Sequence, residues 1–358
     1  MVNKKIFSIS MVKNEMDIIE SFVRYNVNYL DGMIILDNGS TDKTLEILKS
    51  LKNEGLPIFV IEDDTGAFDK ILKMNMLLNK AVHEYNADII TPLDADEFML
   101  SSNGGSPREH IEKLTSPNYF VAKWKVYVPD FTKNQEERFI PRKIVMARDD
   151  STRDWHTLYK VIIPKELVTD YGVTVTRGSH SLVIPPEHKD NLKRVVNPDL
   201  RIAHFPIRSK EQTVSKVAVG WLNAISSVEK KPNDSFHWKN IFSQLKSQKE
   251  IADEDVVAIA SEFSCENDDT PKLLTEDPMD LSFCTNIELK YTNEKINPMS
   301  NLLESCEYMA QSCVDAKKLS IKQQNKLNQM ENSISWKITS PLRKAKAWAK
   351  KIKNRNQK

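Results

Sequence analysis

The sequence Leu-Asp-Ala-Asp-Glu-Phe, at Leu93–Phe98, directly follows an apolar, strand-like run at Ala87–Pro92. It places Asp94, Asp96 and Glu97 at the exposed end of a predicted buried strand. Three carboxylates this close repel one another, so a cation is expected among them. A divalent ion with oxygen ligands fits best, and such ions commonly carry a substrate's phosphates as well. The alternative interpretation is a solvated acidic turn without a ligand.

The residues before this motif form repeated strand–helix units. Apolar runs of strand length occur at Ile6–Val12, Met33–Leu36 and Ile58–Ile61. Apolar residues recur at helical spacing between them, and a further helix is expected over about residues 68–83. Alternating units of this length predict an α/β fold: a mainly parallel sheet with flanking helices and right-handed crossovers.

Every predicted strand is followed by acidic or amide side chains. The carboxyl ends of parallel strands form the ligand-binding edge of such a sheet, so these side chains should converge. An acidic rim repels phosphate, but it holds a diphosphate once a metal ion bridges the two, and its carboxylates accept hydrogen bonds from a ribose and a base. The sequence therefore predicts a nucleoside diphosphate bound through a metal. The rim residues are Asn14–Glu15, Asp37, Glu62–Asp63–Asp64 and the Asp94, Asp96 and Glu97 group.

Other phosphate-binding motifs do not fit this chain. There is no G-x-G-x-x-G after the first strand, no G-x-x-x-x-G-K-[ST], and only 9 glycines in 358 residues. Phosphatases of the haloacid type also carry D-x-D, but near the first strand and without a glutamate directly after it. Phosphate binding by a glycine-rich loop is therefore not expected.

Three motifs occur in order at the strand ends: M-V-K-N-E at Met11–Glu15, D-N-G-S-T-D at Asp37–Asp42, and D-A-D-E-F at Asp94–Phe98. Over about residues 5–220 the chain resembles family 2-type glycosyltransferases, most closely the bacterial branch with a D-x-D-E-F motif. The resemblance implies a GT-A fold, a nucleotide-sugar donor, and Mn²⁺ or Mg²⁺ held by the D-x-D.

The resemblance also assigns a nucleoside side to the site. By position, Asn14, Glu15 and Asp37 would border the nucleoside pocket, with Asp37 near the base or ribose. Ser40 and Asp63 would complete the donor-binding rim.

On the diphosphate side, Asp94 would approach the ribose or the metal, and Asp96 would be the principal metal ligand. Lys73 and Asn75 lie where related enzymes place a basic residue and an asparagine near the diphosphate. A plain surface lysine is the alternative for Lys73.

Two histidines and an arginine of the second half are further candidates. His204, in Ile202–Ser209, is followed by a proline and an Arg-Ser pair as in members of this branch, which makes it the better candidate for a metal or diphosphate contact. His180 is the weaker one, and a structural role is the alternative for both. Arg208 is expected to neutralise diphosphate charge, unless it forms a surface ion pair.

Catalysis requires stabilisation of the leaving nucleoside diphosphate, which the metal on Asp96 would supply. An inverting enzyme, which the resemblance favours, also needs a carboxylate that takes the proton of the acceptor hydroxyl. Glu97 is expected to orient the site rather than to act as this base. No motif separates the candidates for the base, which are Asp130, Asp154 and Glu187.

The length and the apolar pattern predict three regions. These are a GT-A catalytic domain at 1–210, a helical and irregular extension at 211–298, and a long helix with a basic tail at 299–358. Helices are expected over about residues 211–228, 240–262 and 299–335. The last has a sparse apolar stripe, which leaves a homodimer through it open. The net charge of +1 indicates no particular partner.

The last 22 residues, Lys337–Lys358, contain nine Lys or Arg and no acidic residue, and tryptophan and isoleucine are interleaved with them. This pattern predicts binding to an anionic membrane surface, with a disordered basic tail as the alternative. No run approaches the ~18 apolar residues of a membrane-spanning helix, and no signal peptide or nucleic-acid-binding face is evident. We therefore expect a cytoplasmic enzyme, peripheral at the inner face of the plasma membrane.

These patterns together predict a hexosyltransferase-type enzyme that extends a bacterial surface glycan, of the lipopolysaccharide or capsule kind, on a lipid-linked acceptor. A non-catalytic nucleotide-binding scaffold of the same fold and a sugar-phosphate nucleotidyltransferase are the alternatives. The second of these should carry a glycine-rich first loop, where this chain has M-V-K-N-E.

Overall fold

The computed structural model describes residues 3–63, 69–149, 158–226, 236–247, 251–263, 273–284, 287–292, 296–339 and 341–342. The chain divides into two compact units, residues 1–302 and residues 303–358. The first unit contains the sheet and the motifs that the sequence singles out.

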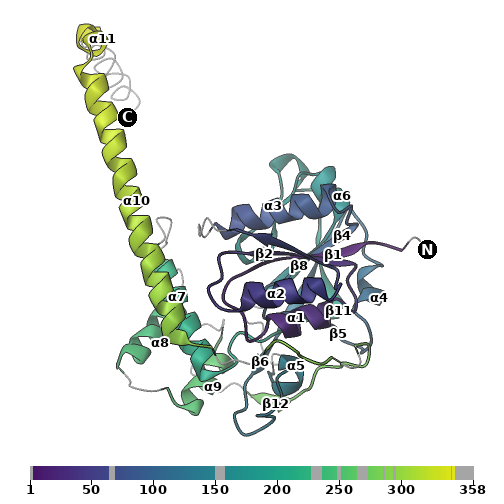
Figure 1. Cartoon of the computed structure of the whole chain (residues 1–358). Helices are drawn as coiled ribbons and strands as arrows, with labels where there is room; N and C mark the ends of the chain where they lie inside the picture. The colour runs from purple at the N-terminus through teal and green to yellow at the C-terminus, as the bar shows by residue number, and fades with distance from the viewer. Residues whose placement is uncertain are drawn as a thin grey trace, which may run out of the picture. The chain divides into compact units, whose positions relative to one another are not determined.

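A ten-stranded sheet is the centre of the first unit (Figure 1). Its order is β12-β7-β6-β8-β4-β1-β2-β3, and β11 pairs with both β5 and β6. A second, two-stranded sheet pairs β9 (Thr174–Val175) with β10 (Leu182–Val183). The strands of the large sheet are β1 (Ile6–Val12), β2 (Gly32–Asp37), β3 (Ile58–Glu62), β4 (Ile89–Pro92), β5 (Glu97–Ser101), β6 (Tyr119–Val128), β7 (Met146–Arg148), β8 (Tyr159–Pro164), β11 (Arg194–His204) and β12 (Leu274–Glu276).

The neighbours β3, β2, β1 and β4 are parallel, as the repeated strand–helix units predict. Their carboxyl ends therefore lie at one edge of the sheet. Because side chains alternate between the faces of a strand, Ile6 and Ile35 pack on one face, while Ile9 and Ile34 pack on the other. Both faces are covered by helices, which explains why these strands are almost continuously apolar.

Helices α1 (Ile19–Asn26) and α2 (Thr44–Asn53) cover one face, and α3 (Lys70–His83) and α6 (Lys165–Thr169) cover the other (Figure 1). The remaining helices of the first unit are short or follow the sheet. They are α4 (Arg108–Ile111), α5 (Ile140–Lys143), the 3₁₀ turns η1 (Arg177–Ser179) and η2 (Pro186–His188), α7 (Lys210–Ser226), α8 (Phe236–Ser247) and α9 (Asp253–Ser261).

Strand β11 brings the second half of the sequence to the D-x-D-E-F motif. It runs antiparallel to β5, with His204 opposite Glu97, and parallel to β6. The acidic motif therefore links two strands: it directly follows β4, and its glutamate is the first residue of β5.

The helices after β11 differ in part from the expected ones. Residues 240–262, expected as one helix, contain the end of α8 and all of α9, because α9 starts anew at Asp253 after the extended residue Ala252. The long helix α10 (Pro298–Asn332) stops at Ser333, whose hydroxyl accepts a hydrogen bond from the Trp336 N–H and caps α11 (Ile334–Ile338). No helix within the described residues is both long and apolar enough to cross a membrane.

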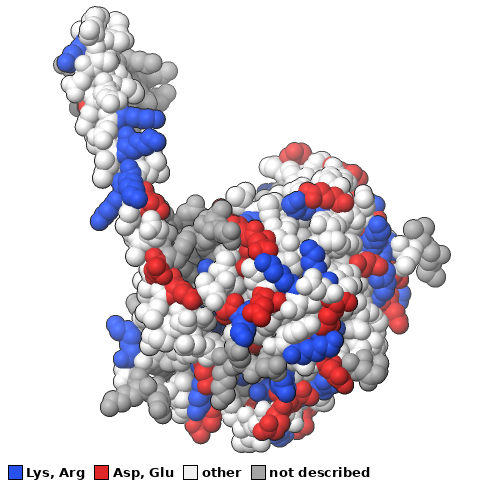
Figure 2. All heavy atoms as spheres, in the orientation of Figure 1, with Lys and Arg blue, Asp and Glu red and all other residues white. Residues whose placement is uncertain are grey.

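Charge is mixed on the part of the first unit that faces the viewer in Figure 2. Acidic and basic side chains alternate there and do not gather into one basic surface. Most basic residues of the expected membrane-binding tail lie beyond Leu342, outside the described residues.

Candidate active site

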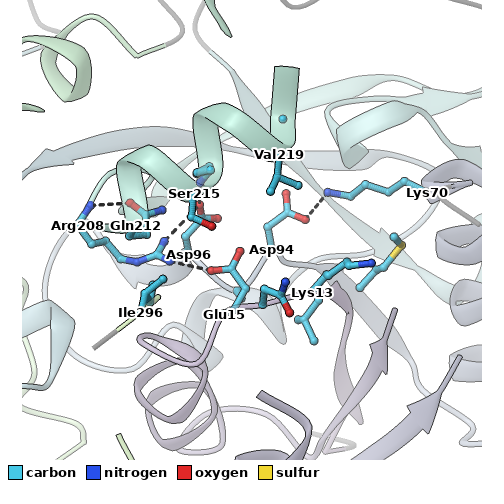
Figure 3. A pocket seen from close by; sticks show the side chains of 16 residues that line it. Lys13, Glu15, Lys70, Asp94, Asp96, Arg208, Gln212, Ser215, Val219 and Ile296 are labelled. Atoms are coloured by element: carbon cyan, nitrogen blue, oxygen red, sulfur yellow. Dashed lines mark hydrogen bonds and ion pairs between the residues drawn. The ribbon is translucent and has the colours of Figure 1, made fainter. Parts of the chain in front are cut away.

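A pocket of about 410 Å³ opens at the carboxyl ends of β1 and β4 (Figure 3). Its wall comes from the end of β1 with the loop after it, the turn after β4, the first residue of α3, and one side of α7. Arg208, just before α7, and Ile296 complete the lining. The predicted site residues in its lining are Asn14, Glu15, Asp94, Asp96 and Arg208.

The backbone of the D-x-D turn is fixed from several directions. The Glu97 N–H donates to the Asp94 carbonyl (3.0 Å), and the Asp94 N–H donates back to the Glu97 carboxylate (2.9 Å). The Phe205 N–H, just after β11, donates to the Asp96 carbonyl (2.8 Å). Asp94 and Asp96 therefore line the pocket, whereas Glu97 is fully buried and holds the turn.

Each carboxylate of the D-x-D contacts basic side chains. Asp94 accepts from Lys70 Nζ on one oxygen (2.7 Å) and from Lys160 Nζ on the other (2.8 Å). Asp96 Oδ2 lies 2.7 Å from Lys216 Nζ and 3.9 Å from the Arg208 guanidinium. Burial raises the pKa of both carboxyls, but these cations outweigh it and hold each pKa below its ordinary value. Both carboxylates are therefore ionised at neutral pH.

Lys160 is a buried ammonium beneath the turn. Besides Asp94 it contacts Glu97 Oε2 (3.0 Å) and donates to the Gly178 carbonyl (2.8 Å). The other oxygen of Glu97 has no hydrogen-bond partner among the described residues. Burial raises the pKa of Glu97 to about 8, against the opposing attraction of Lys160.

Arg208 is a buried residue in the wall of the pocket. Its guanidinium forms a two-fold contact with Asp17 (2.6 and 2.9 Å) and also donates to Glu15 (2.7 Å). The planar fork of arginine suits this bidentate geometry. Burial raises the pKa of Glu15 to about 7, with Arg208 opposing the shift.

The loops after β1 and β2 are tied together at the predicted nucleoside side. The Asn14 N–H donates to Ser40 Oγ (3.0 Å), and the Asn14 side-chain oxygen accepts from the Thr41 N–H (2.8 Å). Asn14 adopts φ 55°, a left-handed conformation that asparagine tolerates. Asp37 accepts from the Ser40 N–H (2.9 Å) through one oxygen, and its other oxygen is buried without a partner among the described residues.

The predicted site residues after β3 and on α3 contact other residues of the protein. Lys73 pairs with Asp63 (2.7 Å) and donates to the Asn38 side-chain oxygen, so it is buried rather than a surface lysine. Asn75 exchanges hydrogen bonds with the backbone of Val175 (2.8 and 3.4 Å) and thereby ties α3 to β9. These residues lie outside the lining of the 410 Å³ pocket.

The two candidate histidines have different surroundings. His204 Nε2 lies 3.6 Å from Asp96 Oδ2, and its ring packs 4.0 Å, centroid to centroid, from Trp124. The Nδ1 atom of His204 is buried without a partner among the described residues. His180 instead contacts the Tyr159 carbonyl through Nδ1 (2.8 Å). Burial lowers the pKa of both rings, that of His180 to about 4, so both are neutral at pH 7.

None of the described base candidates reaches this pocket. Asp130 follows β6 and accepts from the Thr132 N–H and hydroxyl (2.9 and 2.6 Å). Glu187 is exposed on η2, and Asp154 lies outside the described residues. The identity of the base stays a prediction with these three candidates.

Sequence reasoning missed the lysines of the site. Lys160 is a single charged residue inside the apolar strand Tyr159–Pro164, a pattern that indicates a buried ion pair. Gln212, Lys216 and Gly220 are spaced by four on α7 and line the pocket together. This spacing of polar and small residues, next to the apolar face of the same helix, could have indicated that α7 faces the pocket.

The residues present fit a divalent cation in their chemistry. No three His, Cys, Asp or Glu side chains of the described residues are grouped as a ready metal site. However, Asp96 Oδ2 and His204 Nε2 face each other, and Asp94 lines the same pocket. Carboxylate oxygens with one imidazole are ligands suited to Mn²⁺. The Lys216 ammonium against Asp96 Oδ2 demonstrates that this oxygen attracts a cation.

Residues 9–167 match the model of glycosyl transferase family 2. The matched stretch covers less than half of the chain; it runs from within β1 to within α6 and includes the D-x-D turn. The expected resemblance to this family is confirmed over that stretch, and the structure itself confirms the expected α/β fold, with parallel neighbouring strands and flanking helices. A search of curated proteins finds no match to this sequence.

Several solved structures are similar at low identity. The mannosyltransferase PcManGT from Pyrobaculum calidifontis, in complex with GDP-Man and Mn²⁺, matches 73% of this chain and 74% of its own at 15% identity and a TM-score of 0.36. GalNAc-T7 with UDP, GalNAc and Mn²⁺ matches over 74% and 55% at 13% identity and 0.34. Glucosyl-3-phosphoglycerate synthase from Mycobacterium tuberculosis, with Mn²⁺, UDP and glucosyl-3-phosphoglycerate, matches over 26% and 34% at 24% identity and 0.19. The chain thus spans little more than half of the second protein and a third of the third.

Proposed function

We propose that the protein is a metal-dependent glycosyltransferase that moves a sugar from a nucleoside diphosphate donor to an acceptor hydroxyl. The main support for this function is the position of Asp94 and Asp96. Both line a 410 Å³ pocket at the carboxyl ends of parallel strands, within the stretch that matches glycosyl transferase family 2.

The donor is assigned to this pocket by charge and position. The ribose and base lie toward Asp37, whose unpartnered oxygen accepts a hydrogen bond from a hydroxyl or N–H group. Asp94, Asp96 and His204 would hold Mn²⁺ or Mg²⁺, which when bound neutralises charge that develops on the leaving diphosphate. Arg208 keeps Glu15 and Asp17 in place beside it.

The reaction is an inverting transfer. The acceptor oxygen attacks the anomeric carbon, the bond from that carbon to the diphosphate oxygen breaks, and a carboxylate takes the proton of the acceptor. Glu97 is too deeply buried to meet an acceptor and acts by holding the D-x-D turn.

The acceptor is a glycan, most simply one linked to a lipid in bacterial surface polysaccharide synthesis, with a hexose as the transferred sugar. Support comes from the basic, tryptophan-containing end of the sequence, which suits a peripheral position at the cytoplasmic leaflet. A homodimer through α10 remains part of this proposal, because apolar side chains such as Leu319 and Leu327 are exposed on that helix.

A screen of nucleotide sugars tests the function directly. With Mn²⁺ present, the wild-type protein should release a nucleoside diphosphate from one donor class, slowly by hydrolysis and faster with an acceptor glycan. Asp96→Asn should reduce this release by about a hundredfold or more, because the leaving group loses its electrostatic stabilisation. Release of no nucleoside diphosphate from any donor would favour a non-catalytic scaffold.

A further inference from the structure

Four basic side chains surround the D-x-D carboxylates, and they fall into two kinds. The Arg208 and Lys160 side chains are each 2% exposed and contact several groups at once. The Lys70 and Lys216 side chains are 24% and 25% exposed. Each of these two pairs with a single carboxylate and lines the pocket, and Lys216 Nζ also donates to the Pro206 carbonyl (2.9 Å). Figure 3 shows Lys70 beside Asp94. Arg208 and Lys160 are therefore fixed, whereas Lys70 and Lys216 have the solvent access and the flexible stem that permit them to turn.

Lys216 competes with any divalent ion at Asp96. Its ammonium lies 2.7 Å from Asp96 Oδ2, the oxygen that also faces His204. A divalent ion on this oxygen would lie within a few ångströms of the ammonium, where two like charges repel strongly in a partly buried site. Asp96 therefore binds Lys216 or a divalent ion through this oxygen, not both. Lys70 has the same relation to Asp94.

A lysine that leaves its carboxylate needs a new partner, and a diphosphate supplies one. The pocket that receives both ammonium groups is the one assigned to the donor. A nucleotide sugar's diphosphate and one divalent ion also nearly cancel in charge. If the ion and the diphosphate enter together and the two lysines move from the carboxylates to the diphosphate, the net charge of the pocket changes little. Entry of the ion alone or of the diphosphate alone would change it.

We propose that Lys70 and Lys216 are exchangeable cations. In the ligand-free enzyme they hold Asp94 and Asp96, and when a divalent ion takes the carboxylates they turn to the donor's diphosphate. This inference rests on the proposed function and adds two diphosphate-binding residues to it. A consequence is positive coupling: the metal binds weakly alone and tightly with a nucleoside diphosphate, and the reverse also holds.

The test uses the full chain with Lys216→Met and Lys70→Met, which keep the length of the side chain and remove its charge. Mn²⁺ alone is titrated by electron paramagnetic resonance, and UDP and GDP are titrated by calorimetry at saturating Mn²⁺. Each variant should bind Mn²⁺ alone about tenfold more tightly and its nucleoside diphosphate about tenfold more weakly than the wild type. Lys210→Met is the matched control, since Lys210 lies on the same helix, pairs with Asp253 (3.0 Å) and is outside the lining.

Tighter binding of Mn²⁺ together with weaker binding of the nucleotide distinguishes exchange from a purely structural role of the two lysines. Circular dichroism melts verify that the variants fold, and Lys70→Met is the safer of the two because Asp94 keeps Lys160. If the wild type binds Mn²⁺ and nucleotide but the variants bind Mn²⁺ no more tightly, or nucleotide no more weakly, the exchange is refuted while the proposed function stands. A wild type that binds neither ligand contradicts the proposed function, and with it the exchange.

Discussion

At the scale of single residues, the D-x-D-E-F motif combines carboxyl groups with opposite surroundings. Asp94 and Asp96 have cations on their pocket side, which lower their pKa values. Glu97 points into the protein, where burial raises its pKa to about 8. Two of the three acidic groups are thus kept charged and available to a ligand, and the third holds the turn.

The raised pKa of Glu97 makes its contribution to stability dependent on pH. The folded state binds this proton more tightly than the unfolded chain, so the contribution is present below the ordinary pKa of 4.5 and is lost as the pH rises toward 8. We expect the free energy of unfolding of the wild type to fall relative to that of Glu97→Gln over this range, as measured by urea denaturation at a series of pH values. His180 and His204 titrate in both proteins, so their effect cancels in the difference. A difference that stays constant with pH would refute the assignment.

The sequence could predict the acidic residues of the site but not their partners. Asp94 and Asp96 follow an apolar strand, and this local pattern is visible in one short stretch. Lys216 and Arg208 reach the same carboxylate from more than a hundred residues away. No local pattern encodes such a pairing, because it depends on how β11 and α7 pack against the turn.

At the scale of elements, Glu20 of α1 fixes the segment that runs back across the first unit. Its fully buried carboxylate accepts hydrogen bonds from the backbone N–H groups of Lys290, Tyr291 and Thr292 (2.7 to 2.8 Å). Arg24 adds an ion pair at 2.8 Å. Burial raises the pKa of Glu20, but the hydrogen bonds outweigh it and lower the pKa below its ordinary value.

Glu20→Gln should therefore destabilise the protein by about 2 kcal/mol at pH 7, because buried N–H groups lose a charged acceptor. The stabilisation is present above the ordinary pKa of 4.5 and is lost as the pH falls through the lower folded value, so the difference between the two proteins should shrink in acid. Chemical denaturation at pH 7 and at about pH 3 measures both effects. Glu46→Gln, at an exposed position of α2, is the control and should change stability little. Equal losses for the two variants would contradict the anchoring role.

The local elements were predictable where their sequence is periodic, and less so where pairing is distant. The first four strands follow their apolar runs closely. β5 was not predicted, since it forms by antiparallel pairing with β11 about a hundred residues later. The break before Asp253 was missed, although the polar run Lys246–Glu250 interrupts the apolar spacing before it.

At the scale of the whole molecule, the proposed function assigns membrane binding to the basic residues of 337–358. A chain that ends at Leu342 lacks most of these basic residues. We expect it to lose binding to vesicles that contain anionic lipid, since each basic residue near such a surface contributes about 1 kcal/mol. Co-sedimentation with anionic and with neutral vesicles measures this, and high salt should weaken the binding of the full chain. Equal binding of both chains to anionic vesicles would place the membrane contact elsewhere.

The proposed function requires that carboxylates at the carboxyl ends of the strands bind a divalent cation that holds a donor's diphosphate. Calorimetric titration of UDP and GDP, with Mn²⁺ and with a chelator, tests it most directly. The wild type should bind one of them at least about tenfold more tightly with Mn²⁺, and Asp96→Asn should lose this gain. Asp88→Asn, just before the opposite end of β4, should keep it. Affinity that is the same with Mn²⁺ and with chelator, or a gain that survives Asp96→Asn, would contradict the account.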